Sequence, residues 1–433
     1  MRTERPLTGL EALFASCNVR FALMVDLGVT VEQEQVLKSA MAACQSCRLG
    51  HLALAETGTG EWSLVTDTDN TATATVLVKE GVLLEDDEDV SILLDKLVFQ
   101  ETLPAQGPIS IQLIPYQPKA GGSTGLVLYV NANHAICDGR SLTNLVTQST
   151  MSTEKSLEAA QDWKDIQLPD LKEMLQATKM DTWQEDPPFL LGPNNNTITI
   201  QELCSSEKTS KGDESFRYQI SVEIVTKLRQ VLKQKAEGAT LSGLFVAVIM
   251  QSLAMEYRTI KGNSSPNRDI GVSMLVDLRP YLQRPVEKVE QINAAHGHVT
   301  LIDSTDNIFI NNRDNTTSSS IWERSIGMTR QLRARIQRGE AHRAALAFAQ
   351  GQFDRAGPPA TVELSNLGVC QIPDNTKLYT AQRFDGYDGV SCLIHSEPTC
   401  LRWNASVGGG LDAKLVERVF SRAVELCQTI AHD

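Results

Sequence analysis

Residues 126–142, LVLYVNANHAICDGRSL, carry side chains that suit acid–base chemistry. An apolar run ends just before His134, and Asp138 and Gly139 follow before a pattern that predicts a helix from about Ser141. Neutral imidazole, with an ordinary pKa of about 6.5, can take the proton that a hydroxyl or amine loses as it attacks a thioester. We therefore expect His134, at the exit of a strand, to act as a general base. The alternative is a structural histidine that ends the strand.

The spacing of the acidic residue and the glycine is itself informative. With 7 histidines, 53 acidic residues and 28 glycines in 433 residues, about 0.06 matches to His-x-x-x-acid-Gly are expected by chance. We assign Asp138 the task of fixing the turn, in preference to a direct proton relay. Gly139 supports a tight turn because glycine reaches backbone angles that are closed to other residues.

Three other side chains invite chemical interpretations that we weigh lower. Cys137 lies inside the turn, but strand-like alternation points its thiol away from His134, which disfavours a nucleophile. His296 and His298 share one face of a predicted strand and suggest a metal pair. A third ligand at suitable spacing is not evident, so packing is the favoured interpretation and no metal is expected.

The turn resembles that of the chloramphenicol-acetyltransferase-like superfamily. This group includes BAHD-type acyltransferases, alcohol acetyltransferases and the condensation domains of nonribosomal peptide synthetases. The resemblance covers most of the chain and implies an α/β fold of two similar halves, with the His-x-x-x-Asp-Gly turn in the first half and a tunnel between the halves. It implies His134 as the catalytic base, with acyl-CoA or an acyl-carrier protein as co-substrate and no bound cofactor.

Two further segments share the resemblance. Residues 276–281, VDLRPY, are similar to the Val-Asp-x-Arg stretch of BAHD-type enzymes, which implies that Arg279 holds Asp138 in a charge-assisted contact. Such a pair would lower the pKa of the carboxyl and make it a poor base. The run from Ser365 to Gly368 resembles a Ser-Asn-Leu-Gly strand near the tunnel, so Ser365 or Asn366 could donate to the oxyanion. The alternative for these two is an ordinary loop position.

Differences from the motifs of the superfamily narrow the range of functions that we expect. Asn133 precedes His134 where many condensation domains carry a second histidine, and the Asp-Phe-Gly-Trp-Gly segment of plant BAHD enzymes is missing. We expect a fungal or microbial enzyme of secondary metabolism that acylates a hydroxyl, or an amine, of a small natural product. One alternative is a repurposed enzyme that cyclises a polyketide-like substrate or catalyses its cycloaddition. A non-catalytic binding protein is disfavoured by the intact motif residues.

Strand and helix patterns alternate in both parts of the chain. In the first part we predict helices at 31–47 and 90–97 and strands at 19–27, 51–55, 109–113 and 125–131. In the second part we predict helices at 222–236, 241–255 and 412–430 and strands at 216–220, 270–276, 298–302, 360–364, 390–395 and 401–407. Polar and proline-rich sequence between them predicts an N-terminal domain over 1–180, a crossover over 181–214 and a C-terminal domain over 215–433.

Composition excludes several classes of protein. A net charge of −13, without a long Lys/Arg run, argues against nucleic acid as a partner. No apolar run reaches the ~18–20 residues of a membrane span, and polar residues interrupt the N-terminal apolar stretch, so we expect a cytoplasmic protein. If the two halves supply the paired interface within one chain, a monomer is the simplest expectation. Nine cysteines suggest reduced thiols. Cys44 and Cys47 form a C-x-x-C in a predicted helix without a second pair, which favours packing over zinc.

Overall fold

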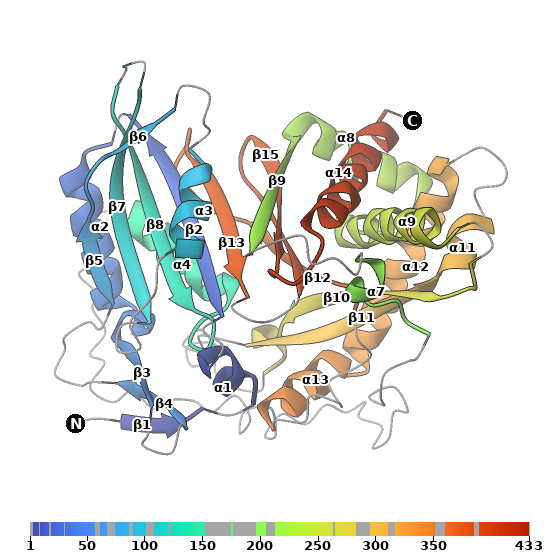
Figure 1. Ribbon diagram of the computed structural model, residues 1–433, viewed down its shortest axis with the longest axis horizontal. Helices are drawn as coiled ribbons and strands as arrows, with labels where there is room; N and C mark the ends of the chain where they lie inside the picture. The colour runs from blue at the N-terminus through green and yellow to red at the C-terminus, as the bar shows by residue number, and fades with distance from the viewer. Residues whose placement is uncertain are drawn as a thin grey trace. The chain divides into compact units, whose positions relative to one another are not determined.

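The computed structural model describes residues 3–7, 9–16, 19–29, 31–56, 61–66, 74–85, 90–100, 108–119, 121, 123–151, 175, 196–204, 213–262, 265–282, 295–310, 317–350, 360–384 and 389–432. The chain forms two compact units, each with a sheet and packed helices (Figure 1). Unit 1 comprises Met1–Met174, Leu282–Ala295 and Val369–Asp385; unit 2 comprises Leu175–Tyr281, His296–Gly368 and Gly386–Asp433. No described helix combines the length and apolarity needed to cross a bilayer.

Unit 1 is built on a sheet with the order β13-β2-β8-β7-β5, to which β6 adds beside β7. Its strands are β2 (Arg20–Gly28), β5 (Thr75–Val78), β6 (Val82–Leu84), β7 (Ile109–Pro118), β8 (Gly125–Asn133) and β13 (Lys377–Arg383). Its helices are α1 (Gly9–Ser16), α2 (Gln33–Ser46), α3 (Ile92–Gln100) and α4 (Gly139–Met151), with a 3-10 turn at Arg48–His51. A smaller sheet joins β1 (Thr3–Pro6), β4 (Trp62–Thr66) and β3 (Leu52–Glu56).

The main sheet of unit 1 is covered on both faces, which explains why β8 is buried along its whole length. Helix α3 packs on the face that carries Met24 and Tyr129, within one apolar cluster. Helices α2 and α4 contact each other, and α4 also contacts β2 and β8. The C-terminal end of β8 therefore enters a turn that is held between packed elements.

Unit 2 is built on one sheet with the order β11-β10-β12-β14-β15-β9. The strands are β9 (Glu214–Ser221), β10 (Asp269–Asp277), β11 (His296–Ser304), β12 (Val362–Val369), β14 (Val390–Ser396) and β15 (Cys400–Val407). The helices are α7 (Ile200–Leu203), α8 (Val222–Lys235), α9 (Leu241–Lys261), α11 (Thr305–Ile310), α12 (Thr317–Gln337), α13 (Glu340–Ala349) and α14 (Ala413–Ile430), with a 3-10 turn at Arg279–Tyr281.

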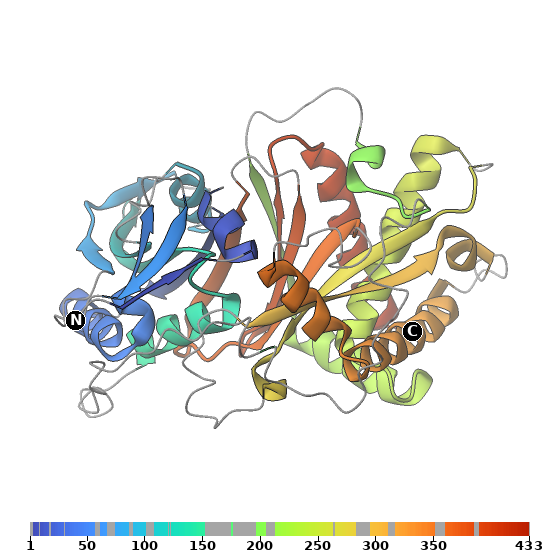
Figure 2. The ribbon, with the colours of Figure 1, turned by 90° about the horizontal axis from the view of Figure 1, so that it is seen from below.

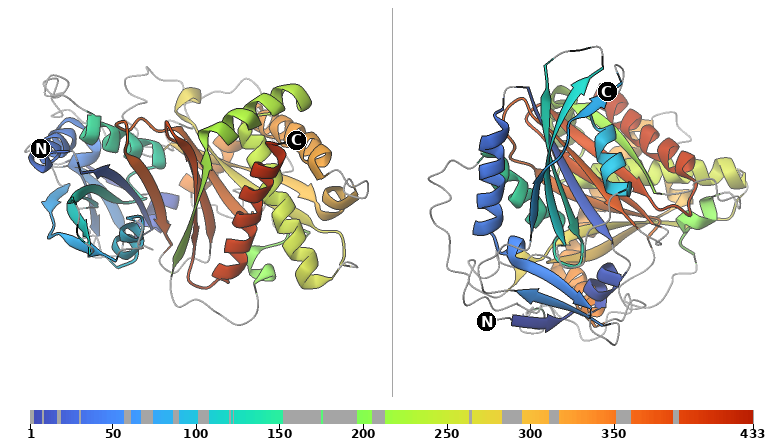
Figure 3. Two further views of the ribbon diagram at one scale, coloured as in Figure 1. Left: turned by 90° about the horizontal axis from the view of Figure 1, so that it is seen from above. Right: turned by 60° about the vertical axis from the view of Figure 1, so that its left-hand side comes forward.

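Helix α9 forms the centre of the unit 2 core. It is buried from Gly243 to Ala254 because it packs against α12 and α14 as well as the sheet (Figure 3). Phe245 of this helix meets Trp403 of β15 edge-on, with ring centroids 5.0 Å apart. Helix α13 lies along β11 (Figure 2). One face of the sheet thus rests on the apolar core.

Local capping explains where several predicted helices begin and end. Ser221 accepts a hydrogen bond from Ile224 N and starts α8, and Thr240 accepts one from Gly243 N and starts α9. After α8 the chain turns at Gly238, whose φ of 85° lies in the left-handed region. These two starts and the end near residue 236 agree with the sequence predictions.

The two units repeat one topological pattern. In unit 1 a strand and helix, β2 and α2, precede a hairpin, β7 and β8, that leads into α4. In unit 2 the strand and helix β9 and α8 precede the hairpin of β14 and β15, which leads into α14. In both sheets the strand that precedes the helix pairs antiparallel with the second strand of the hairpin, β2 with β8 and β9 with β15.

The described structure differs from the sequence predictions in how the chain is divided between the two units. Segments 282–295 and 369–385 belong to unit 1, so the units are not the contiguous halves that we predicted. The reason is that β13 pairs with β2 from Lys377 to Arg383, and such a distant register leaves no local signal.

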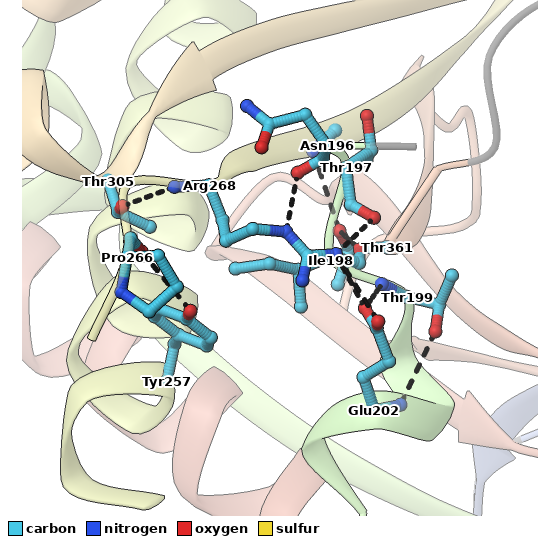
Figure 4. A network of polar contacts seen from close by, with 11 residues as sticks. Asn196, Thr197, Ile198, Thr199, Glu202, Tyr257, Pro266, Arg268, Thr305 and Thr361 are labelled. Atoms are coloured by element: carbon cyan, nitrogen blue, oxygen red, sulfur yellow. Dashed lines mark hydrogen bonds and ion pairs between the residues drawn. The ribbon is translucent and has the colours of Figure 1, made fainter. Parts of the chain in front are cut away.

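Of the predicted crossover at 181–214, the structure describes 196–204 and 213–214. Arg268 binds residues 196–202 to the rest of unit 2 (Figure 4). Its Nε donates to Asn196 O over 2.8 Å, and its Nη2 donates to Thr197 O over 3.2 Å. The same guanidinium pairs with Glu202, which also closes a capping box with Thr199 at the start of α7.

Candidate functional site

The turn after β8 is anchored by its backbone on both neighbouring strands. Asn133 N donates to Pro108 O, the residue before β7, over 2.8 Å. His134 N donates to Val19 O, the residue before β2, also over 2.8 Å. Asn133 Oδ1 accepts from Ala135 N at 2.9 Å and so tightens the turn as an Asx motif. The first residue of the turn, His134, is thereby fixed in place from two sides.

The imidazole of His134 is held in one tautomer. Its Nδ1 lies 2.8 Å from the carbonyl oxygen of Cys137. A carbonyl oxygen only accepts, so Nδ1 carries the proton and Nε2 keeps its lone pair. The ring is 8% exposed and packs on Phe14, with ring centroids 4.6 Å apart, and more distantly on Phe21, at 6.2 Å. The geometry presents Nε2 as the basic atom.

Burial also sets the charge of this ring. Desolvation lowers the pKa of His134 from its ordinary value of 6.5, and this effect outweighs the opposing influence of the Asp138 carboxylate and the nearby backbone. The imidazole is therefore neutral at pH 7. A neutral imidazole with an unprotonated Nε2 can accept a proton from a hydroxyl or an amine that hydrogen-bonds to it.

Asp138 holds the turn through both of its carboxylate oxygens. Oδ1 accepts from Ser141 N at 2.9 Å and from Ser141 Oγ at 3.1 Å, which caps the first turn of α4. Oδ2 accepts from Ala295 N at 3.0 Å, so the same carboxylate binds a segment more than 150 residues away within unit 1. These bonds compete with any role for Asp138 as a proton acceptor.

Gly139 differs from what the sequence suggested. It is the first residue of α4, and it is absent from the described glycines with a positive φ. The expectation of a special backbone angle at this position is wrong. Asp138 and Asn133 make the turn with side-chain bonds instead, so the helix starts with ordinary geometry at Gly139.

Arg279 lies in the 3-10 turn after β10, in unit 2. Its Nη1 pairs with Asp277 Oδ1 at 3.1 Å, and its backbone N donates to the same oxygen at 3.1 Å. Its expected pairing with Asp138 would join the two units and stays a prediction.

The two oxyanion candidates belong to β12, not to a loop. Ser365 is half-buried and Asn366 is exposed. The amide of Asn366 donates from Nδ2 to Ser242 Oγ over 3.1 Å and accepts at Oδ1 from Gly368 N over 2.9 Å. Gly368 has a φ of 75°, which explains a glycine at the end of this motif. The role of Ser365 or Asn366 toward an oxyanion stays a prediction.

The thiol of Cys137 is poorly suited to nucleophilic chemistry. It is fully buried, and its Sγ contacts Asn133 O at 3.5 Å. Burial raises the pKa of this thiol well above its ordinary value, so the reactive thiolate is disfavoured at neutral pH. This agrees with the low weight given to a nucleophile here.

Neither metal alternative gains support from the described residues. The rings of His296 and His298 lie 5.7 Å apart on β11, and Nδ1 of His298 is 3.3 Å from Ser273 Oγ. Cys44 is in α2 and Cys47 follows its end. Across the described ranges, no group of three or more His, Cys, Asp or Glu side chains is arranged to hold a metal ion.

Several residues that contact the site could not be predicted from the sequence. Phe14 reaches His134 from α1, and the backbone of Val19 and Ala295 binds the turn from distant segments. Such contacts leave no motif in a single sequence. In contrast, the Asp-x-x-Ser spacing from Asp138 to Ser141 is a capping pattern that was available in the sequence.

Comparisons with known proteins show the fold. No family model matches the chain. A phenolic glucoside malonyltransferase from Arabidopsis thaliana is 26% identical over 192 residues, which are 41% of this chain and 40% of that relative, so the chain matches less than half of the relative's length.

Solved structures align over nearly the whole chain. Trichothecene 15-O-acetyltransferase from Fusarium sporotrichioides matches with a TM-score of 0.67 and 12% identity over 99% of this chain and 95% of that one. Polyketide synthase associated protein 5 from Mycobacterium tuberculosis matches with a TM-score of 0.62 and 13% identity over 99% of both chains. The condensation domain from Monacolin K polyketide synthase matches with a TM-score of 0.60 and 12% identity over 100% of this chain and 98% of that one. The predicted fold of two α/β halves, that of chloramphenicol-acetyltransferase-like enzymes and condensation domains, is confirmed, and the tunnel between them stays a prediction.

Proposed function

We propose that the chain is an acyltransferase that moves an acyl group from a thioester, acyl-CoA or an acyl-carrier protein, to a hydroxyl or amine of a small natural product. One observation carries the proposal. The bond from His134 Nδ1 to Cys137 O leaves Nε2 unprotonated on a ring that burial keeps neutral. This is the state that a general base needs before the reaction starts. The malonyltransferase and the acetyltransferase named above support transfer of an acyl group.

In the proposed reaction His134 Nε2 takes the proton of the acceptor as its oxygen or nitrogen attacks the thioester carbonyl. The new carbon–oxygen or carbon–nitrogen bond forms a tetrahedral oxyanion. When the carbon–sulfur bond breaks, the imidazolium returns the proton to the leaving thiolate, so the enzyme ends unchanged. Ser365 or Asn366 would donate to the oxyanion, a contribution of about 3 kcal/mol in comparable sites. Asp138, with Arg279, would keep the turn in place, and no metal or bound cofactor takes part.

The experiment that tests this function is thiol release from a panel of acyl-CoA donors with pooled alcohols and amines as acceptors. Thiol release that depends on both donor and acceptor, and that falls at least ~10²-fold in His134→Ala, supports the proposal. Conversion of a polyketide-like substrate that needs no thioester and persists in His134→Ala would instead support the cyclisation or cycloaddition alternative.

A further inference from the structure

Unit 2 has a carboxyl group that the proposed reaction does not use. Glu363 lies in β12, where it is the register partner of Ser273 in β10, and Ser273 is in turn opposite Thr300 in β11. Paired residues project from the same face of a sheet, and neighbouring strands are about 4.8 Å apart. Thr300, Ser273 and Glu363 therefore form one polar row across three adjacent strands.

The polar row contrasts with the residues beside it in the same strands. Val272 and Val362, one position earlier, are also register partners, but they are buried on the opposite, apolar face. Thr361 fixes the start of β12 (Figure 4). Its backbone N donates to Gly271 O over 2.7 Å and its Oγ1 to Ile198 O over 2.6 Å. Glu363 therefore lies two residues after Thr361, whose backbone and side-chain hydrogen bonds hold the start of the strand in place.

Glu363 lacks a counter-charge in the described part of the chain. No hydrogen bond or ion pair involves its carboxyl there, and burial alone raises its pKa to about 7. The residue as a whole is only partly buried. A carboxylate that is removed from bulk water without a partner costs free energy, and a cation from a ligand would offset that cost.

Ser273 supplies a second acceptor beside this carboxyl. Its side chain is buried, and its Oγ lies 3.3 Å from Nδ1 of His298. In the tautomer with an unprotonated Nδ1, Ser273 donates its proton to His298 and its oxygen remains free to accept. Two carboxylate oxygens and one hydroxyl oxygen then match the three N–H donors of an ammonium group.

We propose that Glu363 and Ser273 form a subsite that binds a protonated amine. A neutral alcohol offers a single donor and leaves the carboxylate charge uncompensated, so the subsite discriminates in favour of the cation. In the proposed acyltransferase the ligand is an acceptor whose protonated amine is a different group from the one that is acylated. This identification of the ligand as the acceptor rests on the proposed function, whereas the binding of an amine does not.

The test is calorimetric titration of the full chain, without an acyl donor, with benzylamine and its neutral analogue benzyl alcohol. We expect the wild type to bind benzylamine at least ~10-fold more tightly, and Glu363→Gln to lose that preference. Ser273→Ala should weaken benzylamine binding ~3-fold. Glu425→Gln, which removes an exposed carboxyl of α14, is the matched control and should behave as the wild type.

Two results would overturn the proposal: a wild type without preference for benzylamine, or a cooperatively folded Glu363→Gln variant that keeps the preference. Because no acyl transfer is measured, the amine subsite and the proposed function can fail independently. An active acyltransferase without amine preference refutes only the subsite. An amine preference that depends on Glu363, in a chain that transfers no acyl group, refutes only the function.

Discussion

The turns that follow β8 and β15 occupy the same place in the two units, yet they differ in chemistry. At the end of β8, Asn133 N and His134 N donate to the residues that precede β7 and β2. After β15, Gly408 N donates to Gly389 O, and Gly409 N donates to the Asp213 carboxylate, just before β14 and β9. Gly409 therefore takes the place that His134 holds in unit 1.

Both turns end in an aspartate that caps the next helix. Asp138 binds Ser141 N and starts α4, while Asp412 binds Leu415 N at 3.3 Å and starts α14. The turn after β15 is one residue shorter and has glycines where the first has a histidine and its neighbours. In both units the aspartate cap and the hydrogen bonds to residues before the neighbouring strands hold the turn in place. The basic side chain of the turn after β8 comes from His134.

The largest effect should follow from loss of the histidine itself. His134→Gln should lower kcat/KM at least ~10²-fold, because the variant lacks the basic Nε2. His51 is the matched control, since it is also buried and bonded to a backbone carbonyl, Gln45 O. His51→Gln should keep kcat/KM within ~3-fold. Equal losses in the two variants would mean that His134 matters only for folding.

The pH dependence of activity should report the lowered pKa of His134. Burial disfavours the imidazolium, so the base is neutral above its pKa and is lost as pH falls through it. Profiles of kcat/KM should be flat near pH 7 and should fall ~10-fold per pH unit below a pKa that is itself below 6.5. An acid limb centred above pH 7 would contradict the assignment.

The two helix caps allow a paired test of scaffold against chemistry. Asp412→Ala should destabilise the protein by about 1 kcal/mol and leave kcat/KM within ~2-fold. Asp138→Ala should cost about 1–3 kcal/mol more, because Ala295 N also loses its partner, and kcat/KM should fall ~10-fold as the turn loosens. Denaturant unfolding and steady-state rates check both. Similar values of kcat/KM in the two variants would show that the turn after β8 matters no more for activity than the turn after β15.

Stability should respond to the polar row of unit 2 as well. The folded pKa of Glu363, about 7, exceeds its ordinary value of 4.5, so the wild type loses stability relative to Glu363→Gln as pH rises from about 4.5 to about 7. The change should reach at most about 3 kcal/mol, from about 1.36 kcal/mol per pKa unit. Urea unfolding at pH 4.5 and pH 8 measures it. A difference that is independent of pH would show that Glu363 is not desolvated.

The smallest effect should come from Cys137. Cys137→Ala removes a buried thiol with a raised pKa, so kcat should stay within ~2-fold, while stability falls by about 1 kcal/mol through the lost packing. Loss of activity comparable to that of His134→Gln would indicate covalent chemistry at this cysteine.

Local signals explain most of what the sequence could predict. Ser221, Thr240 and Asp412 lie at helix starts that capping and periodicity mark within a few residues. The strand before His134 was visible as an apolar run, although β8 extends two residues further. Because these features depend on neighbours in sequence, they could be found without coordinates.

Features that depend on distant pairing could not be predicted in this way. The place of β13 beside β2, the bond from Ala295 N to Asp138 and the tautomer set by Cys137 O all depend on backbone atoms, which any residue type supplies. The sequence alone gives Glu363 no special role, because its proposed role depends on its register with Ser273 in a distant strand.

The most direct test of the central claim is nitrogen-15 NMR of His134 in the full chain, assigned by comparison with His134→Gln and followed from pH 5 to pH 8. We predict a hydrogen-bonded Nδ1–H and an unprotonated Nε2 at pH 7, with a pKa below 6.5. A proton on Nε2 at pH 7, either in the opposite tautomer or in a charged ring, would contradict the assignment of His134 as the general base.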